Sequence, residues 1–247
     1  MDQYVYSYSV QADYAENLLT QPCMQKRGYD FPVPWRNLDA LHSASYNDVG
    51  VRLFDQSLAQ QYGYHIAPNN DPSAEQWREA VSKMSNISKD EDSALVACLT
   101  VARKTVPVLP LEAQDATNYS NDAVKKAKQS SPVKKAVAQW RTCMQPLGIA
   151  DLPDTPDGMP TPTLLKQFGM LGDGASGPIS QGEITIATAD AKCQDNTGYK
   201  AALYAQEWNN QVDIIEADAD DLTRVYDQLA KHRKEVMDVI AKHAPSH

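Results

Sequence analysis

The residues of this chain best suited to chemistry are its four cysteines, and two of them begin nearly identical segments. Cys-Met-Gln starts at Cys23 and again at Cys143, and a glycine follows three residues after each segment. Cys98 lies inside an apolar run with helical periodicity, and Cys193 comes just before the last long helical stretch. Because no Cys-x-x-Cys pair occurs in the sequence, this spacing favours two long-range disulfides over a redox motif.

Four cysteines allow three pairings. We favour Cys23–Cys98 with Cys143–Cys193, because the two Cys-Met-Gln segments look like equivalent halves, each joining the end of its helix to the next helix that carries a cysteine. Disulfides persist outside a reducing cytosol, so the pattern predicts an extracytoplasmic protein, secreted or associated with the cell envelope. The alternative is a cytosolic protein with four buried free thiols.

Other chemistry has weaker support in the sequence. His65 is the most interesting histidine, but a metal site or a general base needs partners that the sequence does not place, so a metal site there is a minor alternative. Asp151, Asp154 and Asp157 are spaced three apart, which is not the calcium-binding EF-hand pattern, and we interpret them as a polar loop. Glycine-rich nucleotide, nucleophile-elbow and HExxH motifs are absent. We therefore predict no catalytic residue, no metal and no cofactor.

Charge and length narrow the classes of function further. The 247 residues carry a net charge of −9, which argues against a nucleic-acid partner because phosphates need a continuous basic face. No apolar run is long enough to span a bilayer, and the first residues lack the basic and apolar regions of a signal peptide. We expect a mature domain from which an export segment has been removed, with Met1 added for expression.

Hydrophobic periodicity predicts an all-α fold of about five to seven helices around a long C-terminal helix, with two disulfides. We expect one domain over 1–247, with a subdivision into 1–121 and 122–247 as the alternative, and an irregular loop at 148–182. Helices are expected at 12–24, at 48–61, from Ser73, at 90–104, at 122–144 with a break before Pro132, at 183–192 and at 199–243.

Several segments in order resemble a large group of exported actinobacterial proteins, many of them described only as lipoproteins or hypothetical secreted proteins. These segments are Cys-Met-x3-Gly-Tyr-Asp from Cys23, Gln-Tyr-Gly-Tyr-His ending at His65, Trp-x2-Cys-Met ending at Met144, and Asp-Ala-Lys-Cys ending at Cys193 before a long helix. The resemblance covers about residues 23–231. It implies a helical, disulfide-bonded extracytoplasmic protein with a lipid anchor in the precursor as one alternative, and it implies no catalytic residues.

These observations favour a non-enzymatic binding or interaction protein with a small molecule, a peptide or an envelope protein as its partner. Tyr and Trp offer a large contact area at low entropic cost, so Trp35, Tyr46, Tyr62 and Tyr64, with His65, are the candidate contact residues. Core packing is the competing interpretation for each.

Two alternatives come from other classes of protein. One is an extracytoplasmic carboxylate-based hydrolase, which needs two acidic residues in one cleft with pKa values pushed apart. The other is an oligomer that assembles through an exposed stripe from Trp208 to Ile240 on the last helix. The acidic cluster at 213–221 is interpreted as a solvated face, with a surface for a basic partner as the alternative.

Overall fold

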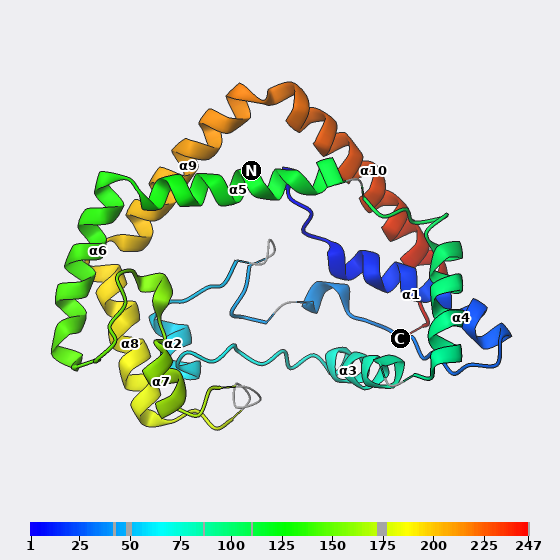
Figure 1. Ribbon diagram of the computed structural model, residues 1–247, viewed down its shortest axis with the longest axis horizontal. Helices are drawn as coiled ribbons and strands as arrows, with labels where there is room; N and C mark the ends of the chain where they lie inside the picture. Colours follow the sequence, from blue (N-terminus) through cyan, green and yellow to red (C-terminus); the bar gives the residue numbers. More distant parts are fainter. Residues whose placement is uncertain (42, 48–50, 86, 110, 172–176, 247) are drawn as a thin grey trace. The chain divides into compact units, whose positions relative to one another are not determined.

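The computed structural model describes residues 1–41, 43–47, 51–85, 87–109, 111–171 and 177–246, and only the backbone of 111–117. Over these ranges the chain forms ten α-helices and four short 3-10 helices, and its one β-type pairing is an isolated bridge between Tyr46 and Arg52 (Figure 1). The predicted all-α class is confirmed. The predicted count of five to seven helices is too low.

The chain divides into two compact units, each built from separate stretches of sequence. Unit 1 comprises residues 1–43, 69–117 and 219–247, and unit 2 comprises residues 44–68 and 118–218. Each unit is described by itself below. Whether the chain behaves as one domain or two stays a prediction.

The helices of unit 1 come from both ends and the middle of the sequence. Their bounds are η1 Asp2–Tyr4, α1 Ser9–Lys26, η2 Leu38–Ala40, α3 Pro72–Ser85, α4 Lys89–Ala102 and α10 Ala219–His243, and α5 Leu111–Lys128 begins in this unit.

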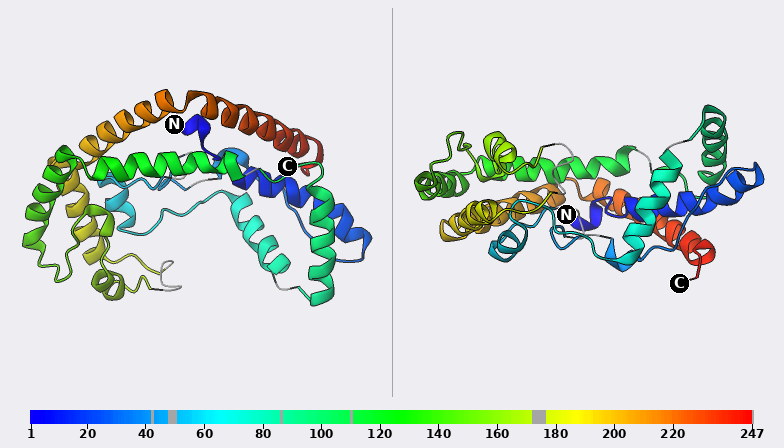
Figure 2. Two further views of the ribbon diagram at one scale, coloured as in Figure 1. Left: turned by 45° about the horizontal axis from the view of Figure 1, so that its top comes forward. Right: turned by 90° about the horizontal axis from the view of Figure 1, so that it is seen from below.

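The core of unit 1 lies where α1 packs against α4 and α10, and α1 and α10 run side by side in Figures 1 and 2. Tyr14, Leu18 and Met24 of α1 are at most 2 % exposed, and Val236 of α10 is fully buried against the same cluster. The disulfide Cys23–Cys98 joins α1 to α4 with its Cα atoms 5.7 Å apart. Burial of one apolar face of each helix therefore explains the packing.

Unit 2 is built around α8. Its helices are α2 Gln56–Tyr62, the second part of α5, α6 Ser131–Met144, η3 Gln145–Leu147, η4 Pro156–Gly158, α7 Pro162–Gln167, α8 Gln181–Asn196 and α9 Tyr199–Ala217. Helix α8 packs against α2 on one side and α6 on the other, and α6 also packs against α9.

The core of unit 2 contains few large aliphatic side chains. Small residues of α2 and α8 such as Ala59, Ala187 and Ala191 let the two helices approach closely. On the α6 side, Trp140 and Met144 are fully buried beside the disulfide Cys143–Cys193, whose Cα atoms lie 5.8 Å apart. Both favoured disulfide pairings are thus confirmed.

Three helix predictions need correction. The helix expected to begin at Asp122 begins eleven residues earlier, at Leu111. The helix expected over 48–61 begins only at Gln56, because the Asp55 carboxylate accepts the backbone N–H of Leu58 and so starts the helix there; residues 48–50 lie outside the described residues. The helix expected over 199–243 is interrupted at Asp218, between α9 and α10. Carboxylates in the first turn of α10, at Asp220 and Asp221, favour a helix start at this point.

The described part of the loop at 148–182 is structured and includes η4 and α7. Thr161 caps α7 through the backbone N–H of Leu164, and three carboxylates in the described part of the loop have separate partners. Asp151 accepts the backbone N–H of Thr163, Asp154 pairs with Arg141, and Asp157 pairs with Lys128.

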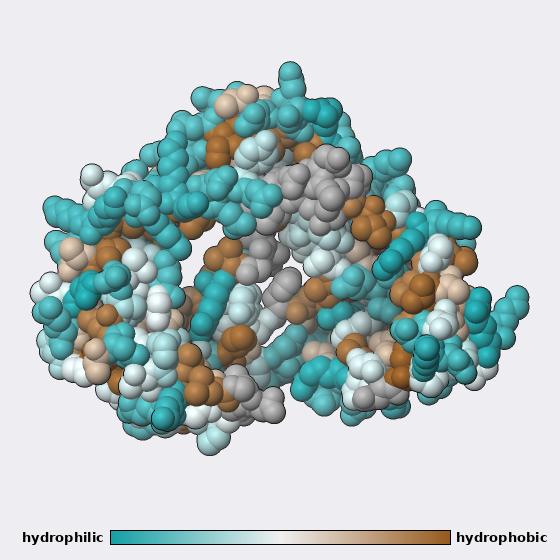
Figure 3. All heavy atoms as spheres, in the orientation of Figure 1, coloured by the Kyte–Doolittle hydropathy of each residue, from teal (hydrophilic) through white to brown (hydrophobic). Residues whose placement is uncertain are grey.

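Most of the surface seen in Figure 3 is hydrophilic, and hydrophobic residues form separate patches on it. Among the described residues, none of the helices combines the length and the apolar character that a membrane crossing requires.

Removing either disulfide is expected to destabilise its own unit. The bridged cysteines are 75 and 50 residues apart, and loops of this length give about 4 kcal/mol per bridge in the chain-entropy model. The double variant Cys143→Ser/Cys193→Ser should lose amide hydrogen-exchange protection in α6 and α8 while α1 and α4 keep theirs. Cys23→Ser/Cys98→Ser should give the reverse pattern. Unchanged protection in both variants would contradict this account.

Candidate functional site

Helix α8 positions two carboxylates inside unit 2. Glu183 and Asp190 lie seven residues apart, which is close to two helical turns and places both on one face of the helix. Neither residue has exposed surface. Ser180 caps the helix by accepting the backbone N–H of Glu183, so the first of the two carboxylates is fixed at the start of the helix. A buried carboxylate is stable only with hydrogen-bond donors around it, and the chain supplies them from distant segments.

The donors to Glu183 come from the segment that follows α2. Its Oε1 atom accepts the backbone N–H of Tyr64 at 2.8 Å and faces His65 Nδ1 at 2.8 Å, so Nδ1 carries a proton and donates it. The side chain of His65 is 5 % exposed and that of Glu183 is fully buried. The Arg52 guanidinium donates to the carbonyl of Tyr64 on the same segment. These contacts hold the chain against the start of α8.

Gly63 explains how the backbone can approach Glu183 so closely. It ends α2 with φ 57° and ψ −125°, a combination that glycine adopts and other residues avoid. A Cβ atom at this position would lie 2.4 Å from Oε1 of Glu183. The glycine is therefore required both by the backbone conformation and by the space.

Asp190 is bound by three donors. Its Oδ1 accepts Trp140 Nε1 at 2.8 Å and Gln194 Nε2 at 3.0 Å, and its Oδ2 accepts the Tyr64 hydroxyl at 3.2 Å. Burial raises the pKa of Asp190 above its usual value, although the three hydrogen bonds oppose the shift. Burial and the nearby Asp190 carboxyl raise the pKa of Tyr64, so its hydroxyl stays protonated. Tyr64 thus contacts both carboxylates, one through its backbone and one through its side chain.

This buried network is enclosed. In the described part of the chain, His65 Nε2 and Glu183 Oε2 are buried atoms without a hydrogen-bond partner. A paired histidine and carboxylate have the composition of an acid–base pair. Both side chains are nevertheless buried, and a substrate would reach them only after unit 2 opened. The arrangement as it stands holds α2, α6 and α8 together.

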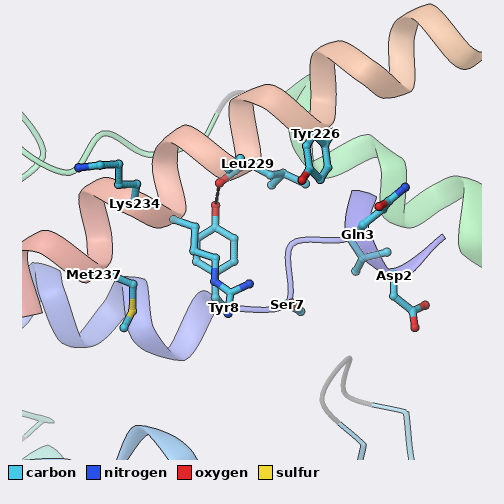
Figure 4. A pocket seen from close by; sticks show the side chains of 11 residues that line it. Asp2, Gln3, Ser7, Tyr8, Tyr226, Leu229, Lys234 and Met237 are labelled. Atoms are coloured by element: carbon cyan, nitrogen blue, oxygen red, sulfur yellow. Dashed lines mark hydrogen bonds between the residues drawn. The ribbon is translucent and has the colours of Figure 1, made fainter.

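The second candidate site is a cavity of about 510 Å³ in unit 1, between the N-terminal segment and α10 (Figure 4). Its apolar wall includes Val5, Tyr8, Tyr226, Leu229 and Met237. Its polar lining includes Asp2, Gln3, Ser7, Arg233 and Lys234. We call this cavity the α10 groove.

Tyr8 forms a fixed wall of the α10 groove. Its hydroxyl donates to the carbonyl of Leu229 at 2.8 Å, as drawn in Figure 4, and lies 3.0 Å from Nδ1 of His232. The other ring nitrogen of His232 donates to the carbonyl of Pro107 at 2.8 Å. Burial raises the pKa of Tyr8, so the phenol stays neutral although Arg233 opposes the shift. The ring is thereby tied to α10.

The two basic side chains of the α10 groove differ in whether a carboxylate pairs with them. Lys234 is paired with Asp238 at 2.6 Å. The guanidinium of Arg233 lies 5.9 Å from the centre of the Tyr8 ring, and no carboxylate among the described residues forms an ion pair with it. Arg233 is therefore a cation beside an aromatic wall and available to an anionic group.

The five residues predicted to bind a ligand are divided between the two units. Tyr64 and His65 lie together in the buried network, and Tyr62 accepts the backbone N–H of His65. Tyr46 lies at the bridge with Arg52. Trp35 belongs to unit 1, where it lines a cavity of about 400 Å³ with Asn37 and Asp71. Their roles in binding stay predictions.

The sequence analysis missed Glu183, Asp190 and the whole α10 groove. Glu183 and Asp190 stand inside a helical stretch where acidic residues ordinarily face water, and only the neighbouring small residues Ala187 and Ala191 indicate that this face is buried. In the described residues, no three His, Cys, Asp or Glu side chains gather as a metal site would need.

Comparison of the chain with protein-family models, with curated proteins and with solved structures gives no match. The functional argument therefore depends on the geometry of these two sites.

Gly63→Ala is expected to lower the free energy of unfolding by about 3–5 kcal/mol, because it combines a disallowed backbone conformation with a collision at a buried hydrogen-bonded carboxylate. Gly148→Ala is the control in the same unit: its φ is 64°, but nothing lies within 4 Å of the added Cβ, so only about 1–2 kcal/mol should be lost. Urea denaturation measures both. Equal losses would mean that the close approach to Glu183 is unimportant.

Asp190→Asn is expected to change the pH dependence of stability. Because the pKa of Asp190 is raised from 3.8, the native state keeps this proton longer than the unfolded state, and the contribution of Asp190 falls as pH rises through its native pKa. The unfolding free energy of the variant minus that of the wild type should therefore increase as the pH rises above about 4. A difference that stays constant or decreases would contradict the raised pKa.

Proposed function

We propose that this chain is a non-enzymatic extracytoplasmic binding protein, and that its α10 groove takes a small ligand with an apolar body and one anionic group. The single observation that carries the proposal is the placement of Arg233, which forms no ion pair with the described residues and lies beside the tyrosine wall of a cavity of about 510 Å³. Small-molecule sites are commonly concave and mostly apolar, with a few polar groups that orient the ligand.

The walls of the α10 groove support recognition by shape. Tyr8 is held by its bond to the carbonyl of Leu229, so this wall needs little reorganisation on binding. Tyr226 is 44 % exposed and Met237 is 41 % exposed, so both offer apolar surface to a ligand. Arg233 is exposed, and an anion beside it would form a charge-assisted hydrogen bond.

The two disulfides support a location outside the cytosol. The finer proposal is secretion or attachment at the cell envelope, as in the exported actinobacterial proteins that the sequence resembles, with a lipid anchor in the precursor as a variant of the same proposal.

Binding is favoured over the carboxylate-based hydrolase because the two fully buried carboxyl groups of α8, those of Glu183 and Asp190, are enclosed and bound to structural donors. A hydrolase needs its acid and its base in contact with substrate.

Two fluorescent dyes test the proposal. 8-Anilinonaphthalene-1-sulfonate has an apolar body and an anion, and N-phenyl-1-naphthylamine has the same body without the anion. Arg233→Ala is expected to weaken binding of the sulfonate dye about tenfold, because one charge-assisted hydrogen bond is lost. The same variant should weaken binding of the neutral dye less than twofold. Tyr226→Ala is expected to weaken the binding of both dyes.

Arg224→Ala is the matched control, because Arg224 lies on the same helix, pairs with Asp221 and does not line the groove. Circular dichroism of each variant checks that the helices are intact. The proposal that the α10 groove binds an anionic ligand is wrong if Arg224→Ala and Arg233→Ala weaken binding of the sulfonate dye equally. It is also wrong if neither dye binds the wild type.

A further inference from the structure

Helix α9 presents an apolar face to solvent. Tyr204, Trp208 and Val212 are spaced four residues apart and are 66 %, 56 % and 37 % exposed. Ala201 and Ala205 are exposed on the same face of the helix. The rings of Tyr204 and Trp208 contact each other, with centroids 6.3 Å apart. These five residues form a continuous stripe, which we call the α9 stripe.

The opposite face of α9 is anchored inside unit 2. It packs against α6, where Tyr199, Ala202 and Leu203 join Val133 in one apolar cluster. Asn210 donates a hydrogen bond to the carbonyl of Ala123 on α5. The α9 stripe is therefore carried by a helix that is already fixed, so binding to it needs little ordering of the backbone. Exposed Trp and Tyr side chains on a rigid support are typical of interaction surfaces.

Several carboxylates gather at the C-terminal end of α9, next to the stripe. Asp213, Glu216 and Asp218 lie in the last turns of α9 and at its C-cap, where the partial negative charge of the helix end disfavours carboxylates. Lys126 lies 3.8 Å from Asp213, but both side chains are about two-thirds exposed, and such a pair contributes little. Elsewhere in the described chain no cation is within ion-pair distance of Glu216 or Asp218. These carboxylates therefore lack a strong cationic partner among the described residues, and an external cation would interact favourably with them.

We infer that the α9 stripe docks a cationic amphipathic segment of another protein, with apolar side chains on Tyr204, Trp208 and Val212 and with Lys or Arg beside Asp213 and Glu216. Charge complementarity favours this occupant over a second copy of the chain, because two copies would bring like charges together. It also disfavours an anionic lipid surface for the same reason.

The stripe ends with α9. In α10 three of the apolar residues that continue its spacing, Leu222, Leu229 and Val236, are at most 4 % exposed, whereas Tyr226 is 44 % exposed and lines the α10 groove. A long continuous seam for a coiled coil is thus not exposed, whereas a surface about three helical turns long matches a short amphipathic segment.

The test uses the full oxidised chain and a synthetic 18-residue amphipathic peptide of leucine and lysine. Titration calorimetry should show binding that Trp208→Ala weakens at least tenfold, with Trp208→Phe recovering most of it. Asp213→Asn/Glu216→Gln should weaken binding about tenfold and reduce its dependence on salt. A leucine–glutamate peptide of the same pattern should not bind.

Matched control variants separate the stripe from general acidity and general apolar surface. Asp90→Asn/Asp92→Asn removes two carboxylates from the first turn of α4, and Val101→Ala removes an apolar side chain that is 57 % exposed. Both should change peptide affinity less than twofold. Equal losses in control and stripe variants would overturn the proposal. Sedimentation of the peptide-free protein as a dimer that Trp208→Ala dissociates would also overturn it, in favour of self-association. Binding of the wild type to phosphatidylglycerol vesicles, abolished by Trp208→Ala, would overturn it as well and would indicate that the stripe binds a membrane.

Discussion

A carboxylate without access to water must be surrounded by hydrogen-bond donors, and in unit 2 this requirement at Glu183 determines the path of the chain from Gly63 to His65. The backbone N–H of Tyr64 and the ring of His65 both bind one oxygen of the carboxylate, so α2 and the residues after it stay against α8. Asp190 repeats the arrangement further along the helix and adds Trp140 of α6. Ala59, Ala187 and Ala191 in the cluster between α2 and α8 let the chain approach closely enough for these polar contacts to form.

Hydrogen bonding of buried polar groups also holds the wall of the α10 groove in unit 1. Tyr8 is buried, and its hydroxyl is satisfied by the carbonyl of Leu229 and by His232, which in turn is bound to Pro107. These bonds draw the N-terminal segment onto α10 and leave Arg233 beside the aromatic ring. A site of this kind depends on hydrogen bonds inside the wall and on one cation at its edge. The proposed preference for a ligand with an apolar body and an anionic group follows from this combination of an aromatic wall and a nearby cation.

Local patterns predicted much of this structure. The Cys-Met-Gln repeat and the apolar spacing around Cys98 favoured the disulfide pairing that the structure has, one of the three that four cysteines allow. The break at Asp218 was missed because an unbroken apolar spacing masked the preference of Asp220 and Asp221 for a helix start. Glu183 was missed because its partners lie 118 and 119 residues away in sequence, and no local pattern encodes such a contact. His65 was singled out without its partner for the same reason.

Hydrogen exchange at the amide of Tyr64 tests the central claim most directly. This amide lies outside any helix, and its acceptor is the buried carboxylate of Glu183. The account predicts that it exchanges as slowly as the amides in the middle of α8, since both would be released by the same opening of unit 2. It also predicts that Glu183→Ala makes this amide exchange rapidly. Fast exchange in the wild type, at the rate of an exposed loop, would show that the carboxylate does not hold this segment and would contradict the account.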